Sequence, residues 1–326
     1  MNRISIALCT YNGAKFISEQ LESIAQQDRI PDELIICDDC STDNTVALIE
    51  DFARKVDFTV KLYINDTRLG VTKNYERAIG LCTGNYIALS DQDDVWDQEK
   101  LRFLEEKLNK RPEVAAVFSN ADIVDESLHS MGYSLWDSLG LTANIQKNIV
   151  TSAAPNLLIM RGSFITGSTM AFRSSFKNLI LPIPECWVHD GWISYLLSAV
   201  SYLDVINQSL IKYRQHNNNQ IGAEKIGFFL RIERAKKRRN DMMLEKLLNR
   251  LDALKERLDC QAYYSLHNAS SLFNVLQKKR NHIYTRVTLP KNKVLRIPAI
   301  LRETVMLKYF KYSNGLNSIA QDLLLN

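Results

Sequence analysis

The first 120 residues alternate short apolar runs with segments of helical periodicity, and this alternation restricts the possible folds more than any other feature. Five runs predict strands, at residues 4–8, 34–37, 58–64, 85–89 and 114–118. Between them, apolar residues recur at intervals that place them on one side of a helix. Strands that alternate with helices form a parallel sheet covered on both faces, and ligands bind beyond the carboxyl ends of such strands.

Polar side chains follow three of these strands, at the point where each strand ends. They are Thr10, Tyr11 and Asn12 after the first strand, Asp38 and Asp39 at the end of the second, and residues 91–94 after the fourth. Because the carboxyl ends of parallel strands meet at one edge of a sheet, we expect these side chains to line one site.

The polar segment after the fourth strand is strongly acidic. Asp91, Asp93 and Asp94 place three carboxylates in four residues, directly after the apolar run 86–89. Like charges at the end of a buried strand repel and require compensation. A divalent cation shared with a phosphorylated ligand would supply it, since Mg²⁺ sites use one or two carboxylates together with substrate oxygens. The alternative is a solvated acidic turn in which Asp97 caps the next helix.

Charge is distributed unevenly along the chain. The net charge is only +4, but residues 1–223 hold 20 Lys and Arg against 28 Asp and Glu, whereas residues 224–326 hold 21 against 9. We therefore expect an α/β domain over residues 1–223 and a basic helical region over residues 224–326, with different partners. Charge alone would attract the basic region to an anionic membrane, a nucleic acid or an acidic glycan.

Several classes of protein are disfavoured. No Gly-x-Gly-x-x-Gly sequence follows the first strand, which argues against a dinucleotide-dependent oxidoreductase. No apolar run approaches the roughly 18 residues of a membrane-spanning helix, and no signal-peptide cleavage site follows the first strand, so a cytoplasmic protein is expected. Aromatic residues of the basic region, such as Tyr263, Tyr264 and Tyr284, have the spacing of helix packing, so no nucleic-acid partner is expected.

Five short segments, taken in order, resemble the successive motifs of family 2 glycosyltransferases. They are CTYNG at 9–13, CDDCSTD at 37–43, Leu69-Gly70 with Asn74, TGNY at 83–86 and DQDD at 91–94. The resemblance covers residues 3–216. It implies a GT-A nucleotide-diphospho-sugar transferase fold, an α/β architecture in which helices flank a Rossmann-like mixed sheet, here with a C-terminal helical extension. The sequences SDQDDVW at 90–96 and YRQH at 213–216 most resemble bacterial rhamnosyltransferases.

The resemblance also implies roles for individual residues. Those expected to bind a nucleotide-sugar are Thr10, Tyr11, Asn12, Asp38, Asp39, Asn74, Asp91 and Gln92. Asp38 would accept the imide N–H of the pyrimidine ring. Asp93, together with His216, would bind Mg²⁺ or Mn²⁺, which neutralises charge on the departing nucleotide. Two alternatives stay open: Asp38 and Asp39 could cap the following helix, and His216 could be a satisfied structural histidine.

The segment 187–192 opens an apolar run at the point where this family places its catalytic base. Asp190 matches the base, which takes the proton of the incoming hydroxyl group, although a helix-capping role is the alternative. His189 stands where glutamate is commoner in the family. Trp187, His189 and Trp192 are expected on the acceptor side, with simple packing as the other interpretation of His189.

The activity implied by the resemblance is inverting transfer of L-rhamnose from dTDP-rhamnose. The acceptor would be a hydroxyl group of a bacterial surface polysaccharide, such as O antigen, capsule or cell-wall glycan, or of a lipid-linked glycan precursor. The alternatives are transfer of a hexose or N-acetylhexosamine from a UDP-sugar, and a non-catalytic nucleotide-sugar-binding scaffold.

Family members that extend lipid-linked glycans work at a membrane, so peripheral attachment at the inner face of the cell membrane is expected. The candidate surface helix is residues 295–307. Its apolar residues are Ile297, Ile300, Leu301 and Val305, and its basic residues are Arg296 and Arg302.

Overall fold

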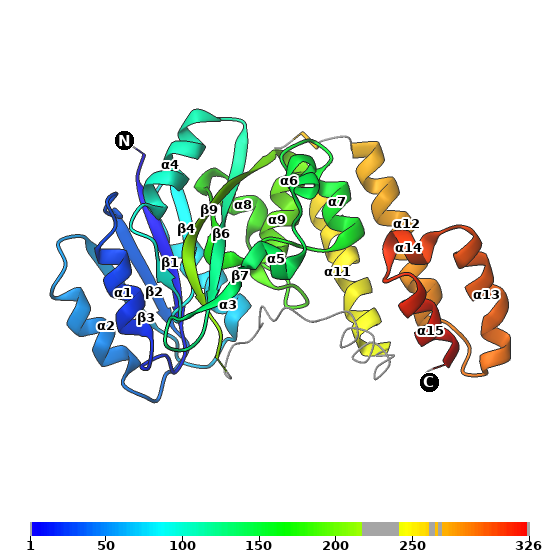
Figure 1. The fold of residues 1–326 in the computed structure, drawn as a ribbon, viewed down its shortest axis with the longest axis horizontal. Helices are drawn as coiled ribbons and strands as arrows, with labels where there is room; N and C mark the ends of the chain where they lie inside the picture. Colours follow the sequence, from blue (N-terminus) through cyan, green and yellow to red (C-terminus); the bar gives the residue numbers. More distant parts are fainter. Residues whose placement is uncertain (1, 217–240, 261–264, 267–268, 325–326) are drawn as a thin grey trace.

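The strand ends that carry the polar motifs meet at one edge of a mixed sheet. The computed structural model describes residues 2–216, 241–260, 265–266 and 269–324 (Figure 1). Within them the strands follow the order β3-β2-β1-β4-β8-β6-β9-β5, with β7 paired to β6. Their bounds are β1 Ile4–Thr10, β2 Glu33–Asp38, β3 Thr59–Ile64, β4 Tyr86–Ser90, β5 Val95–Trp96, β6 Val114–Val124, β7 Ser130–Ser134, β8 Met170–Arg173 and β9 Tyr202–Arg214.

The first four strands form the predicted parallel half of the sheet. β1 pairs in parallel with β2 and with β4, and β2 pairs in parallel with β3. The register places Thr10 opposite Asp38 and Leu8 opposite Ser90. The polar residues after β1, β2 and β4 therefore lie next to one another. Beyond β4 the sheet becomes mixed, because β8 runs antiparallel to both β4 and β6.

Helices cover both faces of this half, because its strands alternate apolar residues between two cores. Ile6 and Leu8 of β1 pack with α1, α2 and α4, whereas Ala7 packs on the opposite face with α3 and α9. The bounds of these helices are α1 Ile17–Ala25, α2 Thr45–Ala53, α3 Val71–Leu81, α4 Lys100–Lys110 and α9 His189–Val200. Both faces are buried, as expected for a largely parallel sheet.

One prediction about the second half is wrong in detail. The sequence predicts two strands, at 202–205 and 210–213, but the structure has the single strand β9. Its pairing with β6 shifts register after Ile206, so that Asn120 lies opposite Ser209. The intervening polar residues 207–208 are exposed, as in a bulge, while the strand continues on both sides.

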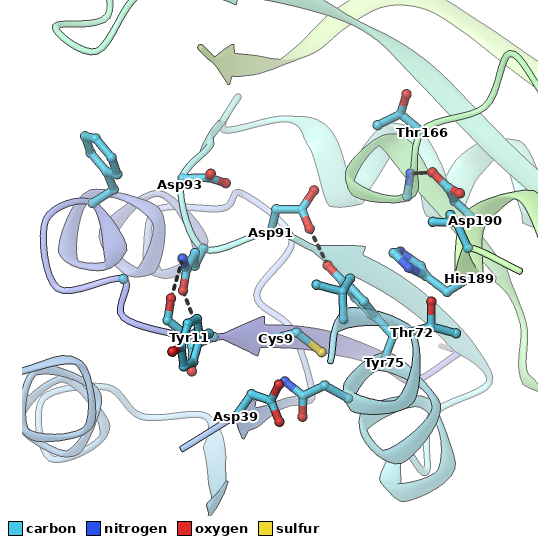
Figure 2. A pocket seen from close by; sticks show the side chains of 18 of the residues that line it. Cys9, Tyr11, Asp39, Thr72, Tyr75, Asp91, Asp93, Thr166, His189 and Asp190 are labelled. Atoms are coloured by element: carbon cyan, nitrogen blue, oxygen red, sulfur yellow. Dashed lines mark hydrogen bonds between the residues drawn. The ribbon is translucent and has the colours of Figure 1, made fainter. Parts of the chain in front are cut away.

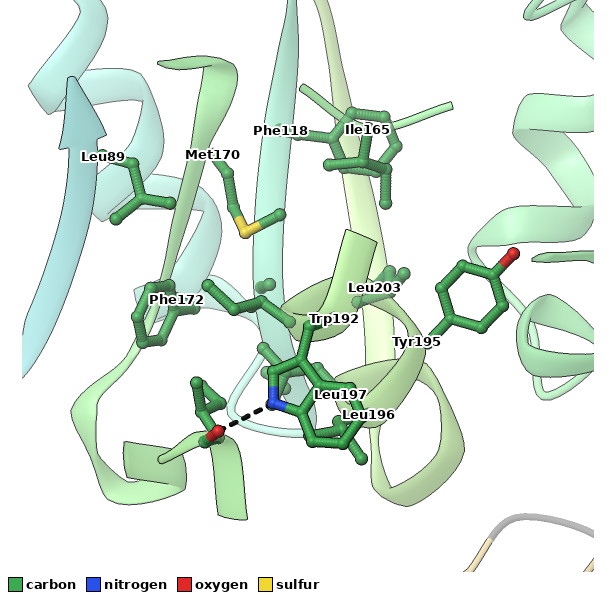
Figure 3. Packing of buried hydrophobic residues seen from close by; sticks show 14 of the residues in the cluster. Leu89, Phe118, Ile165, Met170, Phe172, Trp192, Tyr195, Leu196, Leu197 and Leu203 are labelled. Atoms are coloured by element: carbon green, nitrogen blue, oxygen red, sulfur yellow. Dashed lines mark hydrogen bonds between the residues drawn. The ribbon is translucent and has the colours of Figure 1, made fainter. Parts of the chain in front are cut away.

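Short helices and α9 complete the core beneath β6 and β8. Figure 3 shows Trp192 of α9 packed near Phe172 and Met170 of β8. Almost every α9 residue is buried, which explains its continuous apolar sequence. The short helices are α5 Leu135–Leu139, α6 Ala143–Ile149, α7 Ala154–Arg161 and α8 Lys177–Ile180, with 3₁₀ turns at Gly167–Thr169 and Ser174–Phe176.

The C-terminal region is helical, as predicted, and its described part divides into two groups. The helices are α11 Asp241–Cys260, α12 Ala269–Val287, α13 Lys293–Val305, α14 Lys308–Tyr312 and α15 Leu316–Leu324. Leu254 and Leu258 of α11, with Leu272 and Leu276 of α12, belong to the same hydrophobic cluster as α7 and α9. By contrast, α13, α14 and α15 pack around a small separate cluster.

Some sequence predictions about this region concern residues that the structure does not describe, and another differs in one residue. The proposed boundary at 223/224 and the basic cluster of Arg231, Arg234, Lys236, Lys237, Arg238 and Arg239 lie outside the described residues. The candidate surface helix is present as α13, but Arg296 is buried instead of facing solvent. None of the helices in the described part of the chain combines the length and apolarity that a bilayer crossing requires.

Candidate functional site

A cavity of about 670 Å³ opens at the carboxyl ends of β1, β2 and β4, which is a size typical of small-molecule sites (Figure 2). Most of the predicted site residues line it. They are Thr10, Tyr11, Asn12, Asp39, Asn74, Asp91, Gln92, Asp93, His189, Asp190 and His216. The structure thus brings together residues that are up to about two hundred positions apart in the sequence.

The loop after β1 is fixed to the acidic segment by Gln92. The backbone N–H of Tyr11 donates to Gln92 Oε1 at 2.8 Å, and Gln92 Nε2 donates to the Tyr11 carbonyl at 3.1 Å. A Cβ added to Gly13 would lie 2.3 Å from Gln92 Oε1, so only glycine allows this approach. The Arg68 guanidinium lies 3.9 Å from the centroid of the Tyr11 ring, which places a cation at the cavity wall.

Asp38 and Asp39 end β2 but have different surroundings. Asp38 is fully buried and does not line the cavity. Its Oδ1 accepts from the hydroxyl groups of Thr10 at 2.7 Å and Ser41 at 2.6 Å, and its Oδ2 accepts from the backbone N–H of Ser41. These contacts hold the turn after β2, whereas the first N–H of α2, at Thr45, donates to Asp43. The predicted pyrimidine contact of Asp38 is therefore corrected, because a ligand in the cavity cannot reach it.

Asp39 is the carboxylate of this pair that a ligand can reach. It accepts from the backbone N–H groups of Leu69 at 2.7 Å and Gly70 at 2.8 Å, and from the Asn65 amide at 2.8 Å. Asn74 in turn accepts from that amide at 2.9 Å, which holds it in place. A carboxylate offers about four acceptor positions, so Asp39 retains the capacity to accept one further N–H.

The three carboxylates of the acidic segment separate into two that line the cavity and one that does not. Asp91 Oδ1 accepts from the Tyr75 hydroxyl at 2.6 Å, and Asp93 Oδ2 lies 2.9 Å from His216 Nε2. Asp94 points into the protein and accepts from the backbone N–H of Arg214. Burial and the negative charge of Asp93 raise the pKa values of Asp91 and Asp94.

Two buried basic side chains lie beside this segment. Arg214 donates to the Asp93 carbonyl at 2.8 Å and pairs with Glu19 at 2.5 Å. Lys100 donates to the Ser168 carbonyl at 2.6 Å, and burial lowers its pKa well below the usual value. The compensation predicted for the acidic cluster is thus partly built into the protein.

Asp93 and His216 fit a divalent cation. Carboxylate oxygen and imidazole nitrogen are ligands that Mn²⁺ accepts, and Mg²⁺ is bound chiefly through carboxylates. Within the described residues, no group of three or more His, Cys, Asp or Glu side chains forms a complete cage. Such a sparse donor set suits a cation that takes its remaining ligands from a diphosphate and from water.

Asp190 lies across the cavity from Asp91 and Asp93, in the first turn of α9 (Figure 2). Its Oδ1 accepts from the Gly191 N–H at 2.5 Å and its Oδ2 from the Gly167 N–H at 3.3 Å. Burial raises the pKa of Asp190 to about 6 although these donors oppose the shift. A carboxylate with this pKa is ionised at pH 7 and is a stronger base than an ordinary aspartate.

His189 forms part of the same wall. Its ring stacks on Tyr75, with centroids 3.8 Å apart, and burial lowers its pKa to about 4, so that the ring is neutral at pH 7. Among the described residues neither ring nitrogen has a hydrogen-bond partner. A Cβ added to Gly167 would lie 2.6 Å from His189 Nε2, so a larger residue there would displace the imidazole.

The two tryptophans predicted for the acceptor side lie elsewhere. Trp192 is fully buried and donates its indole N–H to the Ile180 carbonyl at 2.7 Å. Trp187 donates to the Arg250 carbonyl at 3.0 Å and packs against Trp192. Neither lines the cavity. The acceptor-side prediction for both is corrected: α9 turns Trp192 into the core, and Trp187, which precedes α9, packs against Trp192 and Tyr195.

Among the cavity residues that were not identified from the sequence, three contact predicted site residues. Tyr75 and Arg68 adjoin the motif residues Asn74 and Leu69, and this proximity was the only signal for them. Gly167 lies in an irregular stretch before β8, where nothing in the sequence marks it as the neighbour of Asp190.

Comparison with known proteins places these observations in a family. A sequence model described as "Glycosyl transferase family 2" matches residues 5–178. The "dTDP-rhamnosyl transferase RfbG" of Shigella flexneri is 26% identical over 303 residues, which cover 86% of this chain and 98% of that protein. A UDP-glucose-dependent β-1,3-glucosyltransferase of Escherichia coli is 28% identical over 124 residues, covering 38% of this chain and 47% of that protein.

Solved structures share the fold. The Staphylococcus aureus protein TarS 1–349, solved with UDP-GlcNAc, superposes with a TM-score of 0.54 at 17% identity, covering 98% of this chain and 90% of that chain. A mannosyltransferase from Pyrobaculum calidifontis, solved with GDP-mannose and Mn²⁺, gives 0.54 at 16% identity, with coverage of 99% and 87%. The predicted GT-A fold with a helical C-terminal region is confirmed.

Proposed function

The chain belongs to glycosyl transferase family 2, and from that premise we propose that it transfers L-rhamnose from dTDP-rhamnose, with inversion, to a hydroxyl group of a bacterial polysaccharide or its lipid-linked precursor. The choice of donor is supported by the similarity to the S. flexneri dTDP-rhamnosyl transferase, which extends over 98% of that protein. That similarity reaches beyond the catalytic motifs into the C-terminal region.

One observation carries the catalytic proposal: Asp190 lines the same cavity as Asp91 and Asp93, from the opposite side (Figure 2). A donor whose diphosphate lies at the acidic segment would have its sugar between these two walls. Asp190 would then face the acceptor hydroxyl. Its raised pKa suits the abstraction of a proton from that hydroxyl.

The proposed step is a single displacement. The Asp190 carboxylate takes the proton of the acceptor hydroxyl, and the hydroxyl oxygen forms a bond to the anomeric carbon. The bond from that carbon to the diphosphate oxygen breaks on the opposite side, and the nucleoside diphosphate leaves with the electron pair. Inversion follows because the new bond forms opposite the old one.

The proposed cofactor is Mg²⁺ or Mn²⁺, which Asp93 and His216 would hold. When bound, the cation supplies positive charge that stabilises the departing diphosphate. Arg68 lines the same cavity and would contribute a further positive charge on the protein side. Asp39 is the proposed acceptor for the pyrimidine imide N–H, in place of Asp38.

Release of nucleoside diphosphate from a panel of sugar nucleotides, with and without a glycan acceptor, tests the donor assignment. We expect acceptor-dependent release from dTDP-rhamnose. Turnover of UDP-glucose or UDP-N-acetylglucosamine, with none of dTDP-rhamnose, would replace this donor by the UDP-sugar alternative, for which the E. coli relative is the precedent.

Asp190→Asn distinguishes the enzyme from a non-catalytic scaffold. We expect the variant to bind nucleotide-sugar but to lose turnover by about 10²–10⁴-fold, the usual contribution of a general base. Unchanged glycan synthesis in cells carrying the variant would favour the scaffold.

His189→Phe tests whether that residue contacts acceptor. The substitution keeps a ring stacked on Tyr75 but removes both ring nitrogens. A rise in the acceptor KM would support the acceptor contact, and unchanged kinetics would assign His189 to packing.

The proposed location is the inner face of the cell membrane, with the protein attached peripherally through its basic C-terminal region. Residues 224–326 hold 21 Lys and Arg against 9 Asp and Glu, and anionic lipid attracts each basic residue near its surface by about 1 kcal/mol. Recovery of the protein with membranes at low salt, and its release at high salt, would support this location.

A further inference from the structure

Helix α13, the outermost helix of the C-terminal region, exposes aliphatic side chains and buries charged ones, a reversal of the usual arrangement. Along α13, Val294, Leu301 and Val305 recur at intervals that place them on one side of a helix, and they are 70%, 58% and 81% exposed. The opposite side carries Arg296 and Glu303, which are buried. A surface helix ordinarily buries its apolar side and exposes its charges.

The buried charges of α13 are held by a polar interior. His282 of α12 lies 2.8 Å from Glu303, and Lys308 pairs with the same carboxylate at 2.9 Å. Arg296 donates to the Asp322 carbonyl at 3.0 Å and to the carbonyls of two neighbouring loop residues.

Asp322, on α15, is the second carboxylate of this interior. It pairs with Arg286 at 2.8 Å and accepts from the Tyr309 hydroxyl at 2.7 Å. Rotation of α13 to bury its aliphatic side would break the Glu303–Lys308 ion pair, the Glu303–His282 contact and the hydrogen bonds of Arg296 to the carbonyls of Asp322 and two loop residues.

The exposed aliphatic surface continues past the end of α13. Met306, Leu307 and Phe310 are each at least half exposed, and they follow Val305 directly in the chain. Figure 1 shows α13 at the end of the molecule farthest from the sheet, with α14 and α15 between it and the rest of the protein. No described element covers its outer side. A continuous apolar surface of this kind marks an interaction site.

The charges around this surface are all positive. Over residues 288–324 the only acidic residues are Glu303 and Asp322, and both are buried in the pairs described above. The exposed charged residues are Lys291, Lys293, Arg302 and Lys311. Over residues 288–324 the outer surface therefore combines aliphatic side chains with cations and carries no exposed Asp or Glu.

We propose that the α13 apolar face, defined as Val294, Ile297, Leu301 and Val305, docks on an anionic lipid bilayer. The aliphatic side chains enter the boundary between headgroups and acyl chains, and the surrounding lysine and arginine side chains contact lipid phosphates. The inference deepens the proposed function. It rests on that function in one respect, because the proposed acceptor is found at a membrane.

Charge complementarity selects this occupant over a second copy of the chain. Two α13 faces brought together would oppose lysine and arginine with lysine and arginine, without any exposed carboxylate to pair them. A nucleic acid would match the charge but would gain nothing from aliphatic side chains, which cannot stack on bases.

Co-sedimentation of the full chain with vesicles tests the proposal. The probes are two kinds of vesicle. One is phosphatidylcholine alone, which is neutral, and the other contains about 30% phosphatidylglycerol, which makes its surface anionic. The test variant carries Val294→Ser, Leu301→Ser and Val305→Ser, which are exposed and therefore should not disturb folding. The control carries Ile30→Ser and Ile64→Ser, which are 47% and 50% exposed on the catalytic part of the chain.

We expect the unaltered protein and the control to bind the anionic vesicles, and the test variant to bind at least about tenfold more weakly, because three aliphatic side chains no longer enter the lipid. Binding of both proteins should fall as salt rises. Equal binding by the test variant and the unaltered protein would overturn the proposal. So would a dimer in solution that the test variant abolishes, because that result assigns the face to self-association.

Turnover with a soluble acceptor keeps this test separate from the activity. The test variant should match the unaltered protein in that assay. If the unaltered protein shows no turnover but binds anionic vesicles through α13, the proposed function fails and the docking surface stands. If turnover is normal and vesicle binding is absent, the docking surface fails alone.

Discussion

Asp190→Asn is expected to stabilise the protein at the same time as it abolishes turnover. Burial raises the pKa of Asp190 from 3.8 to about 6. The native state therefore holds this proton more tightly than the unfolded chain does, and ionisation costs stability. The stability associated with the proton is fully present below pH 3.8 and is lost as pH rises through 6. One pKa unit corresponds to about 1.36 kcal/mol, so the cost approaches about 3 kcal/mol above pH 7.

Two effects reduce the gain from removing this charge. Asparagine offers one acceptor oxygen, whereas Asp190 accepts from the N–H groups of both Gly167 and Gly191, and a lost hydrogen bond costs about 1 kcal/mol. Asp190 also reaches the water of the cavity, which lessens the cost of its charge. We therefore expect the variant to gain about 1–2 kcal/mol at pH 8 and close to zero at pH 5, where the native protein has regained about half of the stability that comes with the proton.

Urea unfolding followed by tryptophan fluorescence measures this difference. All four tryptophans lie between residues 96 and 192, so the signal reports the part of the chain that contains Asp190. Asp204→Asn is the matched control: Asp204 pairs with Arg111 at 2.9 Å, so its removal should destabilise at both pH values. The compared quantity is the difference in unfolding free energy between Asp190→Asn and the unaltered protein. If this difference is no larger at pH 8 than at pH 5, the claim that burial disfavours the ionised carboxylate is refuted.

Three further outcomes are expected. The value of kcat/KM should fall about tenfold per pH unit below pH 6, as Asp190 becomes protonated, and a flat profile down to pH 5 would point to another base. Chelation of divalent cations should remove turnover, and added Mn²⁺ should restore it. Asp93→Asn should raise the Mn²⁺ concentration that turnover requires, whereas Asp125→Asn, which alters an exposed Asp–His pair, should not. Asp39→Asn should weaken the binding of dTDP about tenfold, whereas Asp38→Asn should mainly lower the thermal midpoint of unfolding. Equal effects of the two variants on dTDP affinity would contradict the distinction between these carboxylates.

The sequence predicted the parallel half of the sheet well because its determinants are local. Strands such as β1 and β4 are short apolar runs between turn residues, and the order of strands and helices then restricts the topology. It also placed Asp91 and Asp93 at the edge of the sheet, because they follow a buried strand, whereas Asp190 was assigned to the site only by the resemblance to the family.

What the sequence could not predict depends on side-chain direction. Adjacent residues at a strand end point to different surroundings, so Asp38 and Asp39 could not be distinguished until the turn after β2 was known. Trp187 and Trp192 flank Asp190 by sequence, but α9 turns Trp192 toward the core and Trp187 packs against it. The reversed polarity of α13 depends on hydrogen bonds with residues of α12 and α15 and on an ion pair with Lys308 of α14, which no local pattern reveals.

The cluster that joins α11 and α12 to α7 and α9 has a consequence for the order of events during synthesis. Leu272 and Leu276 pack with Leu158 of α7, and Lys279 contacts the carbonyl of Ile159. The side of α7 that these helices cover is therefore exposed until the ribosome has released more than four fifths of the chain. A nascent polypeptide of this protein should expose these leucines until late in synthesis, and a stop codon after the last motif residue would yield a fragment with bare leucines that chaperones must bind.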